Sequence, residues 1–290
     1  MKKRRLLKRR QKRLNRSLGG DIALFLFLAV VGAFMALPLI YNLNTAFKPL
    51  NELYKFPPTI FVHNPTTDNF SDLGVILSNS WVPLSRYIFN TVIITGFSVV
   101  GHVILASAAA YPLAKHNFPG KNVLFSIVVL SLMFSYNVTA IPNYMIISKL
   151  GINNNYLAII LPAFASSLGL YLMKQFMEQL PDSLIESARL DGASEFKIFW
   201  TIIMPNVKPA WLTLIILMFQ QVWGNTGGYF LRDEQLKPLN YAINQIALGG
   251  VARAGAASAG ALILMSVPIL LFVFSQSRII ETMATSGMKD

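Results

Sequence analysis

The residues of this chain that could recognise a ligand are polar and uncharged, and they stand at the ends of apolar segments. Tyr136 and Asn137 lie in SYNVTAIPNY, and a second group lies in QQVWGNTGG, namely Gln220, Gln221, Trp223 and Asn225. Amides bond to hydroxyl groups and an aromatic face covers the C–H surface of a sugar ring, so these residue types suit a neutral polyhydroxylated ligand. Hydrogen bonding between helices at a subunit interface is the alternative reading of the same residues.

The remaining polar residues do not assemble into an enzyme centre. The sequence has no cysteine and three scattered histidines, which excludes thiol catalysis and gives no metal-binding set. It lacks a G-x-x-x-x-G-K-[ST] phosphate loop, because FPGKN at 118–122 has no upstream glycine. His102 stands among small residues in GHVILASAAAY, where a packed, hydrogen-bonded histidine is expected and a proton carrier is the alternative. If the chain moves a solute uphill, a partner must supply the energy.

The composition is that of a polytopic, all-α membrane protein. Of 290 residues, 54% are hydrophobic and 13% are charged, and the net charge is +12. Ten lysines and arginines with no acid lie between Lys2 and Arg16. We interpret residues 1–20 as a basic cytoplasmic arm that sets the topology, with no nucleic-acid partner. The apolar stretch after it is too long for a signal peptide and is expected to stay as a first span.

Six segments are long and apolar enough to cross the bilayer. They are Ile22 to Ala46, Ile88 to Ala114, Val123 to Ile147, Tyr156 to Phe176, Pro209 to Phe230 and Gly255 to Phe274. With the basic arm inside, alternation places both termini and the loops 115–121 and 174–208 in the cytoplasm. The two polar groups then share one depth in the outer half of the bilayer. Residues 21–290 form one six-helix unit, and no acidic or basic residue interrupts the central part of any span.

Two further features concern packing and the outer surface. The loop from Phe47 to Tyr87 is rich in proline and is expected to be extended, with little regular structure, serving as a docking surface or as a cap over helix ends. Gly255 and Ala259 form a small-x-x-x-small face, which predicts close approach of another helix.

The cytoplasmic loop at about 179–208, called here the inner elbow, is predicted to be two short helices. Pro181 suits a first helical turn, Asp182 and Ser183 supply acceptors near the start, and Gly192 suits a left-handed end. Ser194 is a candidate cap for the second helix, and Pro205 is its expected stop. The geometry favours an interaction surface, and a plain elbow on the membrane surface is the alternative.

The inner elbow resembles the EAA signature of permease subunits of bacterial ABC importers. The matching residues are Glu186-Ser187-Ala188, Gly192 and Ile202-x-Met204-Pro205, with Ser187 for Ala and Met204 for Leu. Three further stretches resemble MalG-like carbohydrate permeases at consistent spacing: NTVIITGFSVVGHVILASAAAYPLAKHNFPGK, IPNYMIISKLGINNNYLAIILP and MKQFMEQLPDSLIESARLDGAS.

This resemblance implies a type I ABC importer permease in the bacterial cell membrane that is not itself an enzyme. The inner elbow would dock on cytoplasmic ATPases through the ATPase-coupling residues Glu186, Ser187, Ala188, Asp191, Gly192 and Pro205. ATP and magnesium would be bound by two partner ATPase subunits and no cofactor by this chain. A second permease subunit would complete a heterodimer, and an extracytoplasmic binding protein would deliver an oligosaccharide.

The identity of the solute is less constrained. WGNTGGYFLRDEQLKPLNYAINQIALGGVARAG resembles permeases for polysaccharide fragments, some of them acidic, and Arg232, Lys237 and Arg253 would attract an acidic sugar from outside. The alternatives are an ATP-independent secondary transporter or channel, and a membrane scaffold without a transport role.

Overall fold

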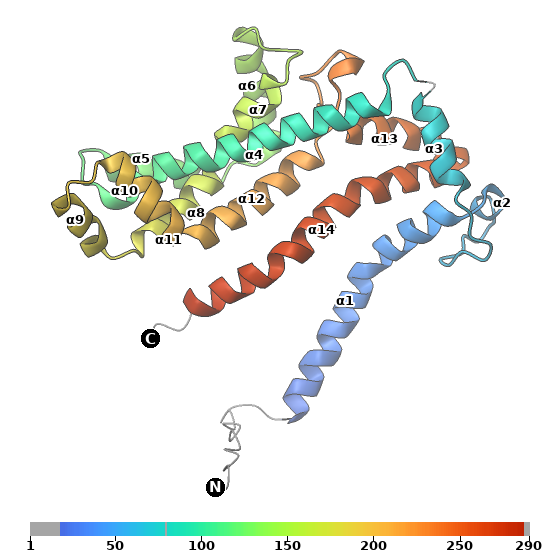
Figure 1. Cartoon of the computed structure of the whole chain (residues 1–290). Coiled ribbons are helices and arrows are strands. Elements are labelled where there is room, and N and C mark those ends of the chain that lie inside the picture. Colours follow the sequence, from blue (N-terminus) through green and yellow to red (C-terminus); the bar gives the residue numbers. More distant parts are fainter. Residues whose placement is uncertain (1–17, 79, 287–290) are drawn as a thin grey trace, which may run out of the picture.

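The computed structural model describes residues 18–78 and 80–286, and no strand occurs among them. Helix α4 (Leu84–Lys115) packs against α12 (Lys208–Trp223), which in turn packs against α14 (Ala254–Ser286). Helix α1 (Leu18–Phe47) leans on α14 at one end and diverges from it at the other (Figure 1). Most of the basic arm, Lys2 to Arg16, lies outside the described residues.

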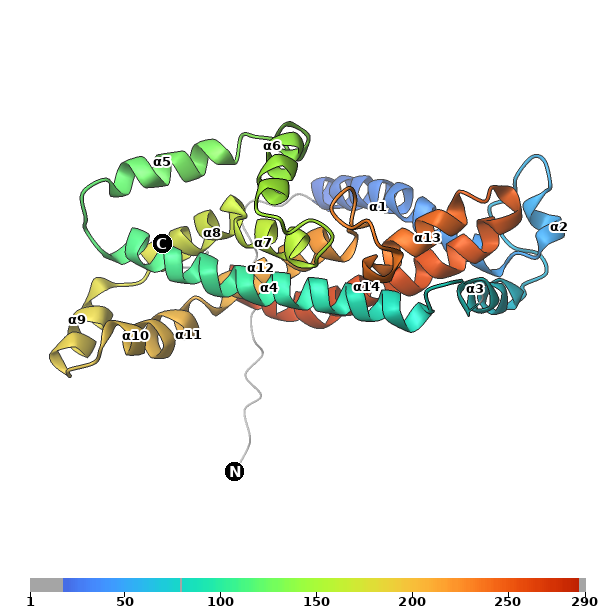
Figure 2. The same ribbon diagram turned by 90° about the horizontal axis from the view of Figure 1, so that it is seen from above.

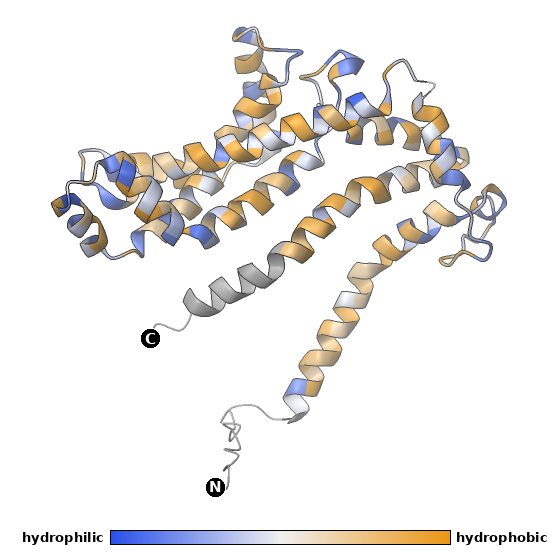
Figure 3. Cartoon of the chain, in the orientation of Figure 1, coloured by the Kyte–Doolittle hydropathy of each residue, from blue (hydrophilic) through white to orange (hydrophobic). Residues whose placement is uncertain are grey.

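Four helices of the described chain are long and apolar enough to cross a membrane: Gly19–Phe47, Leu84–Lys115, Leu157–Glu178 and Val251–Phe274. A fifth is obtained if the pair Glu195–Asn206 and Lys208–Trp223, bent by 79°, is counted as one span. Most residues of these helices are apolar (Figure 3), and many of their large apolar side chains are exposed, as expected where the surroundings are lipid.

The predicted third span is not one continuous helix. Four residues separate helix α5 (Lys121–Ser131) from α6 (Tyr136–Lys149), and the two run in different directions (Figure 2). None of the described residues of α5 is buried. The prediction of an unbroken helix over 123–147 was therefore wrong, because hydropathy measures the length of an apolar segment and not its continuity.

The predicted fourth span is also interrupted, between α7 (Leu157–Phe164) and α8 (Ser167–Glu178). His102 of α4 is buried there, and its Nδ1 lies 3.2 Å from the carbonyl oxygen of Phe164 at the end of α7. A Cβ on Gly169 would come within 2.0 Å of Nε2 of this ring, so only glycine lets α8 lie over it. The packed, hydrogen-bonded histidine predicted from the sequence is confirmed.

Lys174 lies inside the range predicted as the fourth span, near the inner end of α8. Its ammonium lies 2.6 Å from the Glu178 carboxylate and 3.9 Å from the centre of the Phe125 ring. The charge is therefore neutralised by a neighbour one turn along the helix.

The outer loop is more regular than its prolines indicated. It contains α2 (Leu50–Leu53) and the 11-residue α3 (Asp68–Ser78), which packs against α14 beside α13 (Leu239–Ala247). Asn69, Leu73 and Leu77 recur every four residues and are buried. The prediction of little regular structure in 47–87 was wrong for this segment, because the prolines of the loop all lie outside α3.

The small-residue face of α14 does receive a close neighbour. A Cβ on Gly255 would lie 2.1 Å from Oδ1 of Asn69, and Ala259 is fully buried. The Asn69 amide donates to the carbonyls of Ala46, at 2.9 Å, and Lys48, at 2.8 Å. The neighbour is thus α3 with its buried amide, which ties the end of α1 to α14.

Candidate functional site

The inner elbow lies at one end of α4, opposite the outer module of α2, α3 and α13 (Figure 1). Helix α9 (Asp182–Leu190) is followed by Gly192, whose φ of +77° is the left-handed conformation expected for it. Ser194 caps helix α10 (Glu195–Ile198), as predicted: its hydroxyl accepts a hydrogen bond from the Lys197 amide. Pro181 precedes the first helical residue instead of occupying it.

The two faces of α9 differ in character. Ile185 and Ala188 are buried against α4, α8 and α12, whereas Glu186, Ser187 and Asp191 are exposed. The hydroxyl of Ser187 therefore points to solvent and needs no partner within the chain. The three residues of the motif are thus divided: Ala188 packs against the bundle, whereas Glu186 and Ser187 are available to another molecule.

Sequence reasoning missed a set of large apolar side chains on the same elbow. Leu190 is 89% exposed and Phe196 is 75% exposed, and Leu184 and Trp200 are also exposed. The available signal was the helical spacing of α9. Leu190 lies two residues after the buried Ala188 and therefore falls outside the buried face of this amphipathic helix. Exposed apolar groups beside acidic ones are typical of a protein-binding surface.

Pro205 lies in a short, irregular helical segment just before a sharp bend of the chain, and no helix ends at it. Residues Phe199–Ile203 form a π-helix, followed by α11 (Met204–Asn206). The chain turns by 79° before α12, and Val207 lies at the turn. Because proline has no N–H, Pro205 cannot donate the backbone hydrogen bond of a regular α-helix, and the π-helix lies directly before this position. The predicted stop is therefore displaced by two residues, to Val207.

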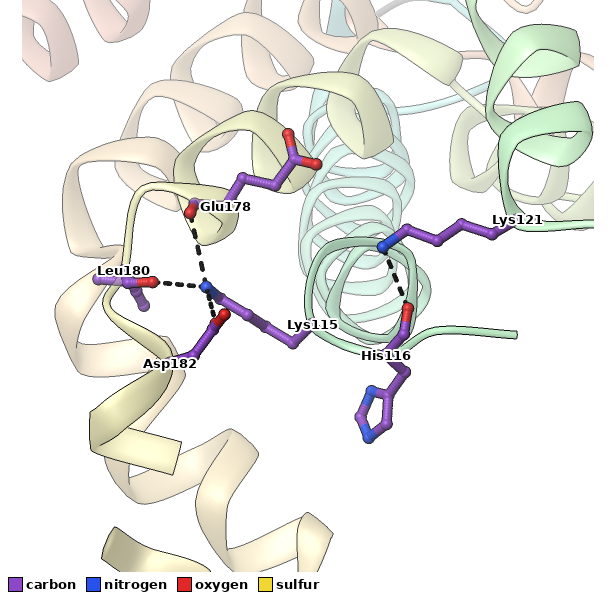
Figure 4. Close-up of polar contacts among 6 residues, drawn as sticks. All are labelled: Lys115, His116, Lys121, Glu178, Leu180 and Asp182. Carbon is purple, nitrogen blue, oxygen red and sulfur yellow. Dashed lines mark hydrogen bonds and ion pairs between the residues drawn. The ribbon is translucent and has the colours of Figure 1, made fainter. Parts of the chain in front are cut away.

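Lys115, the last residue of α4, binds the elbow directly (Figure 4). Its ammonium donates to Asp182 Oδ1 at 2.7 Å, to the Leu180 carbonyl at 2.5 Å and to the Glu178 carbonyl at 3.5 Å. This contact lowers the pKa of Asp182 from the ordinary range of a carboxyl. Asp182 thus pairs with α4 and does not cap its own helix.

A second polar contact joins α4 to the far side of the elbow. The Tyr111 hydroxyl donates to Glu195 Oε2 at 2.7 Å, and Arg189 donates to Glu195 Oε1 at 2.8 Å. His116 Nε2 lies 3.4 Å from Glu195 Oε2. These bonds, the one from Tyr111 foremost, lower the pKa of Glu195. This cluster could not be predicted from residue spacing, because its members lie up to 84 residues apart.

The two outer polar groups meet in part. Thr139 and Asn143 of α6 line a pocket of about 200 Å³ together with Gln221 and Asn225. We call this the α6–α12 pocket; its other walls are Ala158, Ile159, Pro162, Ala163, Val222 and Phe230. Asn137 and Gln220 are exposed and do not line it, and the side chain of Tyr136 lies outside the described part of the structure.

Trp223 has a different environment from the one predicted for a ligand contact. Its indole N–H donates to the Leu264 carbonyl on α14 at 2.8 Å, and its ring stacks on Phe219 at 4.9 Å. The side chain therefore joins α12 to α14, which agrees with the alternative interpretation of these residues as hydrogen-bonding groups between helices.

The three outer basic residues do not share one site. Arg232 is exposed and lines a groove of about 540 Å³ with Tyr144 and Tyr229. Lys237 is buried, which lowers its pKa, and its ammonium donates to the Gly228 carbonyl at 3.3 Å. Arg253 lines a separate pocket beside α3. None of the three lines the α6–α12 pocket.

Comparison with known proteins gives consistent matches over most of the chain. The family described as "Binding-protein-dependent transport system inner membrane component" matches residues 102–284. Protein LplC of Bacillus subtilis (strain 168) is 30% identical over 240 residues, covering 79% of this chain and 76% of that protein. The arabinooligosaccharides transport system permease protein AraQ of Halalkalibacterium halodurans is 26% identical over 270 residues, covering 91% and 94%.

A solved structure shares the fold. The crystal structure of a bacterial ABC transporter involved in the import of the acidic polysaccharide alginate contains a chain that superposes with a TM-score of 0.75 at 20% identity. The match covers 90% of this chain and 98% of that chain.

Proposed function

Because this chain belongs to the family of binding-protein-dependent transport system inner membrane components, we propose that it is one permease subunit of an ATP-driven importer of oligosaccharides. The observation that carries the proposal is the exposed elbow, on which the acid Glu186 and the apolar Leu190 face solvent at the inner end of the bundle. A surface of this kind suits a soluble protein partner.

In this proposal the inner elbow docks on a cytoplasmic ATPase. Glu186, Ser187 and Asp191 supply polar contacts to the ATPase. Ala188 packs α9 against the bundle, Gly192 forms the turn after α9, and Pro205 lies at the far end of the elbow. Two ATPase subunits bind ATP with magnesium, and a second permease subunit completes the translocation path. An extracytoplasmic binding protein delivers the solute to the outer module.

We further propose a membrane arrangement of six crossings: α1, α4, the interrupted pair α5 and α6, the pair α7 and α8, α12, and α14. Residues 1–20 form the cytoplasmic arm and 21–290 the permease domain, with both ends of the chain in the cytoplasm of a bacterial cell. The alternation of loops and the arm of ten basic residues support this orientation.

The α6–α12 pocket is our candidate for a saccharide contact in the path. Gln221 and Asn225 offer amides across from Thr139 and Asn143, a set that suits the hydroxyl groups of a sugar. AraQ is named for arabinooligosaccharides, and the structural neighbour imports alginate. Arg232, which lines the groove with Tyr144 and Tyr229, favours an acidic oligosaccharide as the finer assignment, since a guanidinium binds a carboxylate in a planar pair.

The test is ATP hydrolysis by the reconstituted complex with Glu186→Ala in this chain. We expect weaker retention of the ATPase and loss of stimulation by the loaded binding protein. Lys149→Ala, which removes an exposed charged side chain in the last turn of α6, away from the elbow, serves as the control. Unchanged assembly together with unchanged stimulation in Glu186→Ala would refute the docking role.

A further inference from the structure

The inner end of α4 holds both ends of α9. Tyr111 and Lys115 are four residues apart on α4, so their side chains lie on one face of that helix. Lys115 bonds to Asp182, the first residue of α9, and Tyr111 bonds to Glu195, beyond its last turn. Arg189 in that last turn bonds to the same carboxylate. The two contacts therefore fix α9 at its start and at its end.

The surroundings of Lys115 are built for an ammonium group. Its side chain is 4% exposed, whereas that of Asp182 is 75% exposed. Three N–H donors meet three acceptors, two of which are carbonyls left unpaired where α8 ends. A charge buried to this extent requires such partners, so a neutral side chain cannot replace it without loss of contacts.

The apolar side of α9 supports the same attachment. Ile185 and Ala188 belong to a buried cluster that includes Ala110 and Tyr111 of α4. The polar contacts thus flank an apolar interface, and the combination resists both sliding and rotation of α9 against α4. A joint of this kind transmits displacement in either direction.

The other end of α4 is fastened to the outer segment 234–239. Asn90, fully buried, donates to the carbonyls of Gln235 and Lys237 at 2.8 and 2.7 Å. Arg86 also donates to the Gln235 carbonyl at 3.1 Å, and Thr91 accepts from the Leu239 amide at 2.8 Å. Between these fixed ends α4 is one helix of 32 residues, roughly 48 Å long.

We propose that Lys115 and Tyr111 are positioning residues that clamp the inner elbow to α4, so that α4 carries movement of the elbow to the outer segment 234–239. The proposal rests on the proposed function, because the movement originates in the ATPase docked on the elbow. It assigns the clamp to side chains outside the EAA signature and to a helix that does not itself meet the ATPase.

The experiment uses the full complex in phospholipid vesicles, with a fluorophore on Gln235→Cys of this chain. The chain has no cysteine of its own, and the Gln235 side chain is exposed while its backbone makes the contacts with α4. The signal is compared before and after addition of magnesium ATP with vanadate. The test variants are Lys115→Met and Tyr111→Phe. The control is Lys121→Met, which loses a bond to the His116 carbonyl but leaves every hydrogen bond to Asp182 and Glu195 in place (Figure 4).

We expect the nucleotide-induced signal change to fall at least fivefold in Lys115→Met and about twofold in Tyr111→Phe, and to persist in Lys121→Met. The ATPase should still co-purify with all three variants, since none alters the exposed face of α9. A signal change equal to wild type in both test variants would overturn the clamp, and so would the absence of any change in a wild-type complex that retains its ATPase.

A second measurement separates failure of the clamp from failure of the proposed function. Amide hydrogen exchange of residues 182–195 is followed in the permease without ATPase, where docking plays no part. We expect faster exchange in Lys115→Met and Tyr111→Phe than in wild type or Lys121→Met. Equal exchange in all four chains overturns the clamp, whereas a wild-type permease that never retains an ATPase overturns the proposed function alone.

Discussion

Replacing Gly255 by alanine should destabilise the outer module. The added methyl group would lie 2.1 Å from Oδ1 and 2.8 Å from Nδ2 of Asn69, so the amide must move. That movement breaks its bonds to the Ala46 and Lys48 carbonyls. Two hydrogen bonds worth about 1 kcal/mol each, with buried carbonyls left unpaired, give a loss of roughly 2 to 4 kcal/mol in the free energy of unfolding.

The assay is thermal unfolding of the purified permease in detergent, compared with a matched glycine replacement. Gly74 lies on the exposed side of α3, and a Cβ there would meet nothing within 4 Å. Gly74→Ala should therefore raise stability by about 0.5 to 1 kcal/mol through the helix preference of alanine. A Tm for Gly255→Ala equal to that of Gly74→Ala would refute the reasoning.

The cause can be isolated with Asn69→Ala. This change removes the amide that the new methyl group would displace, so Gly255→Ala should add little further loss in the Asn69→Ala background. Full additivity of the two losses would show that the methyl group acts on some other neighbour.

Three further predictions concern the inner elbow and the α6–α12 pocket. Gly192→Ala places a side chain at φ +77° and should destabilise the elbow by about 1 kcal/mol, seen as faster proteolysis between α9 and α10. Because Lys115 lowers the pKa of Asp182, this pair stabilises the fold at pH values above the ordinary carboxyl pKa, and the stabilisation is lost as pH falls through the lowered pKa. The decrease of Tm on acidification should therefore be smaller in Asp182→Asn than in wild type. Gln221→Ala should reduce uptake of the transported oligosaccharide more than Trp223→Phe, which should lower Tm instead through loss of the bond to Leu264.

Elements that depend on local sequence were predicted well. The turn at Gly192 and the cap at Ser194 follow from the steric freedom of glycine and from the hydroxyl of serine, which act within a few residues. Helices α1, α4 and α14 follow from long apolar runs, because length and hydropathy alone identify a crossing.

Features that depend on packing between distant segments were not predictable in the same way. Lys115 and Asp182 are 67 residues apart, so no spacing rule joins them. Three of the four residues between α5 and α6 are apolar, so hydropathy alone did not separate the two helices. Trp223 was assigned to a ligand by its residue type, whereas the position of α14 decided its partner.

The most direct test of the transport role is uptake by vesicles that contain the complete complex. Labelled arabino-oligosaccharides and alginate oligosaccharides are supplied outside with the loaded binding protein, and ATP is enclosed on the side of the inner elbow. The proposed function predicts accumulation of one of these saccharides only when ATP, the binding protein and the ATPase subunits are all present. Accumulation driven by an ion gradient without ATP would contradict it and would identify the chain as a secondary transporter.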